Sequence, residues 1–234
     1  MGDSSARAFV IGHSHVRTVS EAAAHDGAPV TVVDFWALKT PTVVRNGETT
    51  LCEAVTEQLN GAPVFSMIGG STHHVGLLTH ARAFDFVLPA APDLPLERRS
   101  EIIPYHSVRA AMRDITEEYL QLMRLLRAAT SGRLYHLEPP PVSGEQARMA
   151  PDLRLLPIYR RGATVAPRYM RYKLWRVHTD LLSEFCSEND IAFVRNPGAV
   201  ADDEGFLRPE YYKDPMHANE AYGRVVLHHI LELA

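Results

Sequence analysis

The sequence predicts an α/β fold, a three-layer α/β/α sandwich built around a five-stranded parallel sheet. Five short apolar runs are separated by stretches with helical periodicity. The runs are continuously apolar and do not alternate with polar residues, which is typical of strands buried on both faces. A chain in which strands and helices alternate folds through right-handed crossovers, and these place helices on both faces of the sheet.

The expected strands are residues 7–11, 29–36, 63–68, 133–137 and 191–195. The second is rich in β-branched residues, which favour strands. The third ends at Gly69-Gly70. The fourth stops at Glu138 and three prolines, which cannot continue a sheet ladder. The last is stopped by Asn196-Pro197-Gly198.

Four helices are expected between and after these strands, over residues 16–24, 107–130, 169–189 and 217–233. The second is the clearest, because its apolar residues recur near helical spacing and Ser131-Gly132 closes it. The third and fourth also carry apolar residues on one face.

Two proline-containing stretches fit neither pattern. We expect insertions at about 75–104 and 139–168 within a single domain spanning residues 1–234. Loops of this length are more often lids or binding surfaces than filler. The arginines of 154–171 are expected to form a solvated face. Four aromatic residues are expected to pack in the core or under a lid: Tyr159, Tyr169, Tyr172 and Trp175.

Composition is that of a globular protein, with 46% hydrophobic and 22% charged residues. A net charge of −4 gives no electrostatic reason to expect nucleic acid or an anionic membrane as a partner. Cys52 and Cys186 lie far apart and are expected to be reduced. The polar N-terminus does not read as a signal peptide and no run reaches membrane-spanning length, so we expect a cytoplasmic protein. The oligomeric state is not determined by the sequence.

Chemistry-bearing residues are concentrated in two short motifs near the chain ends. Gly12-His13-Ser14-His15 follows the first expected strand, and Asp214-Pro215-Met216-His217 precedes the last expected helix. A serine is a weak nucleophile until a base takes its proton, and that base works best when a carboxylate fixes its tautomer. Ser14, Asp214 and His217 supply these three groups in that order.

Polar clusters also follow the third and fourth expected strands. These are Gly69–His74 and Glu138–Pro141. In an open parallel sheet, ligands bind outside the carboxyl ends of the strands. All four clusters are therefore expected on one rim.

These motifs resemble those of the SGNH hydrolase superfamily, also called GDSL-like esterases. The resemblance implies a flavodoxin-like sheet, a nucleophilic serine after the first strand, and an Asp-x-x-His block before the last helix. Ser14 matches the serine, and Asp214 and His217 match the last block, which Asn219, Tyr222 and Gly223 continue. The resemblance spans nearly the whole chain except the two insertions.

The chain departs from the family pattern at two positions. His13 replaces the aspartate before the nucleophile, and Ser71 stands where the family's asparagine would donate to the oxyanion. Losing one such donor typically costs about 10²–10³ in rate. His73 or His74 is a candidate replacement donor, beside the backbone amides of Ser14 and Gly70. Gly47 is the one candidate for the family's second-block glycine.

Simpler roles and rival functions compete with a serine triad. Ser14 and Asp214 fit helix caps equally well, and His217 fits a first-turn surface histidine. A metal-dependent phosphoesterase is one rival, with ligands drawn from His13, His15, His73, His74, Asp214 and His217. A non-catalytic SGNH-like domain that binds a glycan or a protein is the other.

We conclude from the sequence that a serine-dependent ester hydrolase or acyltransferase is the best-supported function. The family resemblance implies small acyl esters as substrates, including acetyl groups on carbohydrate. No metal or other cofactor is expected.

Overall fold

The fold is described from a computed structural model. The residues that it describes are 7–38, 40–45, 47–57, 59, 61–76, 78–79, 84–149 and 164–234.

A five-stranded sheet lies at the centre, with all neighbouring strands parallel and the order β2-β1-β5-β9-β11. The strands are β1 (Ala8–Gly12), β2 (Val30–Asp34), β5 (Val64–Met67), β9 (Leu134–Leu137) and β11 (Ala192–Val194). Each corresponds to one of the five apolar runs, so the prediction of a parallel α/β sheet is confirmed. Gly12 pairs with both Asp34 and Met67, which aligns the carboxyl ends of the first three strands.

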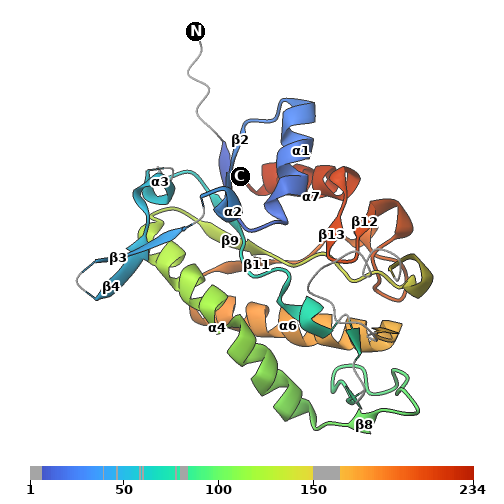
Figure 1. The fold of residues 1–234 in the computed structure, drawn as a ribbon. Coiled ribbons are helices and arrows are strands. Elements are labelled where there is room, and N and C mark those ends of the chain that lie inside the picture. Colours follow the sequence, from blue (N-terminus) through green and yellow to red (C-terminus); the bar gives the residue numbers. More distant parts are fainter. Residues whose placement is uncertain are drawn as a thin grey trace.

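Helices cover both faces of this sheet (Figure 1). α1 (Val16–Asp26) and α7 (Glu220–Leu233) lie on one face, and α4 (Tyr105–Ala129) and α6 (Arg168–Glu188) lie on the other. Alternate residues of β1 divide between the two cores: Val10 packs beneath α1 and α7, whereas Phe9 and Ile11 pack beneath α4 and α6. This two-sided burial explains why the strands are continuously apolar.

α1 and α7 approach each other closely at Gly223. A Cβ atom built on Gly223 would lie 2.1 Å from the backbone oxygen of Thr18. Only glycine permits this distance, so Gly223 sets the packing of the two helices.

Two boundaries differ from the expectation. The second strand ends at Asp34, because the Asp34 carboxylate accepts a hydrogen bond from the Trp36 amide at 2.8 Å and starts the short helix α2 (Phe35–Leu38). The last helix starts at Glu220, not at His217. Its N-cap is Asn219, whose side chain accepts a hydrogen bond from the Tyr222 amide at 3.2 Å.

His217 instead lies in a small antiparallel pair of strands. β12 (Tyr212–Asp214) and β13 (His217–Ala218) are joined by a tight turn that brings Asp214 opposite His217. The described residues also form three short 3-10 helices: η1 (Thr72–Gly76), η2 (Gly198–Val200) and η3 (Pro209–Tyr211).

The sequence did not reveal the hairpin of β3 (Thr42–Arg45) and β4 (Glu48–Leu51), or the following α3 (Glu53–Thr56). Gly47 lies at the turn of this hairpin with φ +82°, a conformation that favours glycine. The turn therefore explains the glycine at position 47 better than a role as the second-block glycine does.

Short strands organise the two insertions. β6 (Leu78–Thr79) pairs with β10 (Thr164–Val165), and β7 (Phe84–Asp85) pairs with β8 (Glu101–Ile102). A fully buried ion pair fastens the first insertion to α6, since the Lys173 ammonium lies 2.9 Å from the Asp85 carboxylate.

The aromatic cluster forms as expected in part. Tyr169 and Tyr172 contact Phe206, and Tyr172 contacts Trp175. Tyr159 and most of the expected arginine face lie outside the described residues. The expectation of a solvated face is wrong for Arg171, which is buried because its guanidinium donates to the carbonyls of Ala166 and Ser143.

Candidate active site

The β12–β13 turn pairs a carboxylate with an imidazole. Both carboxylate oxygens of Asp214 lie 3.0 Å from His217 Nδ1. The same carboxylate accepts hydrogen bonds from the backbone amides of Met216 at 2.8 Å and His217 at 3.0 Å. Burial opposes ionisation of Asp214, but the hydrogen bonds from the His217 ring and these amides outweigh it and lower its pKa. Asp214 is thus held in its ionised form and fixes the His217 ring through Nδ1.

Ser14 lies in the turn between β1 and α1. Its carbonyl accepts a hydrogen bond from the Arg17 amide at 3.2 Å. The N-cap of α1 is His15, and no side chain caps this helix. The Ser14 side chain is partly buried and its hydroxyl makes no hydrogen bond to another described residue. Neither Ser14 nor Asp214 is therefore a helix cap. The Asp214 carboxylate instead accepts the amides of the β12–β13 turn.

His15 is the residue at which three turns of the rim meet. Its ring centroid lies 5.3 Å from that of His217 and 6.4 Å from that of His74, and its Nε2 lies 2.9 Å from Ser71 Oγ. Because Ser14 precedes His15, these contacts bring the Ser14 turn, the Ser71 turn and the β12–β13 turn into one region. No distance between Ser14 and His217 falls within hydrogen-bonding range in the described residues.

The Gly69-Gly70 turn depends on the absence of side chains. Gly69 has φ +71°, and a Cβ atom on it would lie 2.9 Å from Tyr119 Cβ. A Cβ atom on Gly70 would lie 2.9 Å from His15 Cδ2. The turn can therefore present its backbone against His15, which fits the expectation that Gly70 lies in the binding region.

The two adjacent histidines of the rim have different surroundings. His74 lines a small cavity of about 10 Å³ together with Pro140, Pro141 and His217. His73 is buried, and its Nδ1 lies 3.2 Å from Nδ1 of His178 on α6. Burial, assisted by neighbouring imidazoles, lowers the pKa of both His73 and His178, the latter to about 3. His74 is therefore the better placed of the two to contact a substrate.

His13 contacts three aromatic rings. Its centroid lies 5.5 Å from Phe35, 5.8 Å from Trp36 and 5.2 Å from Tyr119, each nearly perpendicular. Its Nδ1 is buried without a hydrogen-bond partner in the described structure. Burial lowers the pKa of His13 although Asp34 opposes the shift. His13 is thus a neutral ring in an aromatic surround.

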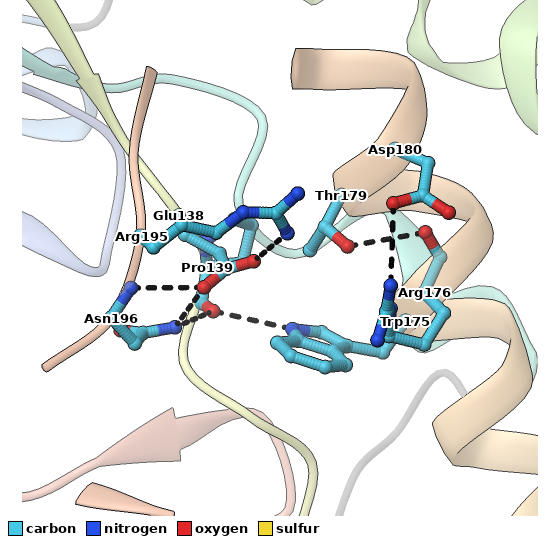
Figure 2. A network of polar contacts seen from close by, with 8 residues as sticks. All are labelled: Glu138, Pro139, Trp175, Arg176, Thr179, Asp180, Arg195 and Asn196. Atoms are coloured by element: carbon cyan, nitrogen blue, oxygen red, sulfur yellow. Dashed lines mark hydrogen bonds and ion pairs between the residues drawn. The ribbon is translucent and has the colours of Figure 1, made fainter. Parts of the chain in front are cut away.

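A polar network fixes the wall formed by the proline run (Figure 2). The Glu138 carboxylate accepts hydrogen bonds from Arg195 at 2.8 Å and from the Asn196 amide at 2.9 Å. The Pro139 carbonyl accepts from the Asn196 side chain at 2.8 Å and from the Trp175 indole at 3.2 Å. This network joins the ends of β9 and β11 to α6. It positions Pro140 and Pro141 next to His217.

The candidate ligands of the metal-site alternative do not all lie together. His15, His74, His217 and Asp214 gather in one region, whereas His13 lies in its aromatic surround. Across the ranges that the structure describes, no group of three or more His, Cys, Asp or Glu side chains is arranged to hold a metal ion.

No helix among the described residues is long and apolar enough to cross a membrane.

Sequence reasoning missed several residues of this region. Tyr119 and Trp36 were absent from the expected site, and His15 entered only as a hypothetical metal ligand. The one signal for His15 in the sequence is its position directly after Ser14, at the start of the helix that follows the first strand.

No protein-family model and no curated protein matches the chain. Similar solved structures include a GDSL-like lipase from Bacteroides thetaiotaomicron, with 11% identity, a TM-score of 0.47, and coverage of 100% of this chain and 89% of the other. A carbohydrate acetylesterase from Sinorhizobium meliloti has 12% identity, a TM-score of 0.45 and 97% coverage of both chains. An aryl esterase from M. smegmatis has 14% identity, a TM-score of 0.43, and coverage of 97% and 98%. The resemblance to SGNH hydrolases continues to rest on the motifs and the order of the sheet.

Proposed function

We propose that this protein is a serine-dependent ester hydrolase or acyltransferase that acts on small acyl esters, including acyl groups carried on carbohydrate. The observation that carries the proposal is the Asp214–His217 pair, with both carboxylate oxygens 3.0 Å from Nδ1. It belongs to the same rim as the Ser14 turn, to which His15 connects it through its ring contact with His217. Ser14 has a hydroxyl that serves no capping role.

The proposed reaction uses each group in turn. His217 Nε2 takes the proton of the Ser14 hydroxyl as its oxygen attacks the ester carbonyl carbon. The tetrahedral intermediate collapses, the alcohol leaves with the proton from His217, and an acyl-Ser14 ester remains. Water, or the hydroxyl of an acceptor, then attacks that ester as His217 takes its proton. The bond to the Ser14 oxygen breaks, His217 returns the proton to that oxygen, and the carboxylic acid or the new ester is released. Asp214 keeps the proton on Nδ1 and stabilises the imidazolium.

The oxyanion is assigned to donors at the carboxyl ends of β1 and β5. The backbone amides of Ser14 and Gly70 are proposed to donate, with the Ser71 hydroxyl as a third group. His15 is neutral at pH 7, because burial and the neighbouring His217 lower its pKa to about 3. When His15 Nε2 carries the proton, it donates to Ser71 Oγ and leaves the serine hydrogen for the oxyanion. His15 is therefore a positioning residue in this proposal.

The small cavity beside His217 leaves no room for a long acyl chain. Its volume of about 10 Å³, between His74, Pro140 and His217, is close to the space of a single water molecule. A long acyl chain on this side would require the proline wall to move, and the network around Glu138 holds that wall.

The test is hydrolysis of a short-chain aryl acetate by the wild type and by Ser14→Ala, with and without a chelator. We expect Ser14→Ala to reduce kcat to the uncatalysed background, and the chelator to leave activity and melting temperature unchanged. Ser187→Ala on the exposed end of α6 is the matched control and should keep full activity.

Two results would overturn the proposal. Retained activity in Ser14→Ala would exclude Ser14 as the nucleophile. Loss of activity on chelation, with stoichiometric zinc or manganese in the purified protein, would favour the metal-dependent alternative.

A further inference from the structure

A second, larger cavity lies beside the Ser14 turn and is not used by the proposed chemistry. Its volume is about 600 Å³, within the range of small-molecule sites. It lies between α2, the β3–β4 hairpin and α4, and its apolar and aromatic lining residues are Phe35, Trp36, Pro41, Tyr119, Leu122 and Leu125. We propose that this cavity binds a methylated ammonium group on the alcohol part of the ester, so the inference rests on the proposed function and names its substrate class.

The cavity is joined to the catalytic turns on two sides. His13, in its lining, directly precedes Ser14. Tyr119, also in the lining, packs against Gly69 so closely that a Cβ atom on Gly69 would lie 2.9 Å from Tyr119 Cβ. The alcohol part of an ester whose carbonyl lies at Ser14 can therefore extend into this cavity.

Aromatic rings form the wall of the cavity nearest to Ser14. Phe35, Trp36 and Tyr119 all contact the His13 ring, with centroid distances of 5.5, 5.8 and 5.2 Å. Trp36 is also 61% exposed, so its ring is open to a ligand. The face of an aromatic ring carries partial negative charge and attracts cations, and tryptophan does so most strongly. Methylated ammonium groups, which combine a positive charge with apolar methyl groups, are bound by aromatic rings for this reason.

The charge in the described part of the lining is negative. Glu118 lines the cavity and makes no ion pair or hydrogen bond with another described residue. Burial raises the pKa of the Tyr119 hydroxyl, and the charge of Glu118 adds to this rise, so the carboxylate acts on the aromatic wall. His13 adds no positive charge, because burial lowers its pKa. The lining therefore favours a cation over an anion.

Two arginines of neighbouring helices have their charges paired with other groups. Arg17 of α1 lies 2.9 Å from the Asp34 carboxylate, and Arg124 of α4 lies 3.1 Å from the Glu117 carboxylate. Neither arginine lines the cavity. They therefore leave the charge of Glu118 available to a ligand.

The exposure of Glu118 distinguishes an ammonium group from a ligand that is rich in hydroxyl groups or purely apolar. An exposed carboxylate keeps its water, so ligand hydroxyl groups gain little by replacing that water. Its attraction for a cation, in contrast, acts without direct contact. A purely apolar alcohol would use the ring surfaces and gain nothing from the charge. A methylated ammonium group uses both.

The experiment compares two acetate esters of the same shape, acetylcholine and 3,3-dimethylbutyl acetate, in which a carbon atom replaces the charged nitrogen. We expect the wild type to have a kcat/KM about tenfold higher for acetylcholine. Trp36→Leu keeps an apolar side chain but removes the ring, so it should lower this ratio to about twofold. Glu118→Gln should lower the ratio about threefold at low salt and less at high salt. The intrinsic reactivity of the two esters is the same for every variant, so changes in the ratio report the cavity.

Ile115→Ala and Glu188→Gln are the matched controls. Ile115 is exposed on α4 outside the lining, and Glu188 is an exposed acid at the end of α6. Neither substitution should change the ratio. Equal kcat/KM values for the two esters in the wild type would overturn the ammonium site, as would a ratio that Trp36→Leu leaves unchanged. An equal fall in the ratio in Glu118→Gln and Glu188→Gln would also overturn it, because net charge and not the cavity would then select the cation.

A binding experiment separates this inference from the proposed catalysis. Choline carries no acyl group, so its binding reports the cavity alone. In Ser14→Ala we expect a saturation-transfer NMR signal from choline that disappears in Ser14→Ala/Trp36→Leu and persists in Ser14→Ala/Ile115→Ala. Absence of choline binding in Ser14→Ala, while Ser14 proves essential for ester hydrolysis, would reject the ammonium site and leave the proposed function standing. Choline binding in a protein without esterase activity would reject the proposed function and leave the ammonium site standing.

Discussion

His15 Nε2 lies 2.9 Å from Ser71 Oγ, although the two residues belong to turns after different strands. His15 directly follows Ser14 in the chain, and its ring centroid lies 5.3 Å from that of His217. The contact with His15 gives the Ser71 side chain a fixed orientation. It also gives a reason for a histidine after the nucleophile, since a neutral imidazole can hold the hydroxyl without adding charge.

Substitution of Ser71 tests this relationship. Ser71→Ala is expected to lower kcat for a simple ester about 10²-fold, because it removes a donor to the oxyanion. Ser71→Asn should also lower kcat, since the longer amide would meet the His15 ring. A double-mutant cycle with His15→Gln should be non-additive, because both changes remove the same contact. Additive losses, or higher turnover in Ser71→Asn, would show that the two residues act independently.

Asp214→Asn tests the orientation of His217. An asparagine amide favours the wrong tautomer of the imidazole, so we expect kcat to fall about 10⁴-fold with little change in KM. The side chain is 39% exposed, so the folded state should survive, and the melting temperature checks this. Asp203→Asn, an exposed aspartate outside the site, is the control. A loss of less than tenfold would argue against a triad.

Acid should destabilise the protein through its buried histidines. Burial lowers the folded-state pKa of His15, His136 and His178 to about 3, against an unfolded value near 6.5. The unfolded chain therefore binds more protons between these pH values. The stability that each neutral histidine contributes is present above pH 6.5 and is lost as pH falls toward 3, by about 1.4 kcal/mol per pH unit and per histidine.

Urea unfolding at pH 7.5, 6 and 5 measures this loss. His178→Gln should reduce the slope of stability against pH, whatever it does to stability at pH 7.5. A free energy of unfolding that is constant from pH 7.5 to 5 would contradict the expected burial of these rings.

Gly223→Ala tests the packing of α7 on α1. The new Cβ atom would meet the Thr18 carbonyl oxygen at 2.1 Å, so the helices must separate. We expect a loss of at least about 1–3 kcal/mol in the free energy of unfolding. Ala221→Ser, exposed on the same helix, should stay within about 0.5 kcal/mol of wild type. Equal stability of Gly223→Ala and wild type would mean that α1 and α7 are not packed at this distance.

The sequence by itself determined the layers of the fold and the five strands of its sheet. Continuous apolar runs and helical periodicity are local patterns, and chain order with right-handed crossovers is enough to arrange them in a parallel sheet. The same logic predicted that the turns containing Ser14 and Ser71 lie on one rim. Only the tertiary structure decided which side chains of that rim meet.

The contacts that the sequence analysis could not resolve depend on distances between remote segments. His73 and His74 are adjacent in the chain, yet one contacts His178 on α6 and the other lines the cavity of His217. The start of α7 was misplaced because the Asp214 turn forms a β-pair, whose partner no local pattern reveals. His13 contacts Phe35 and Trp36 of α2 and also Tyr119 of α4, and no local pattern in the sequence reveals that these remote rings meet.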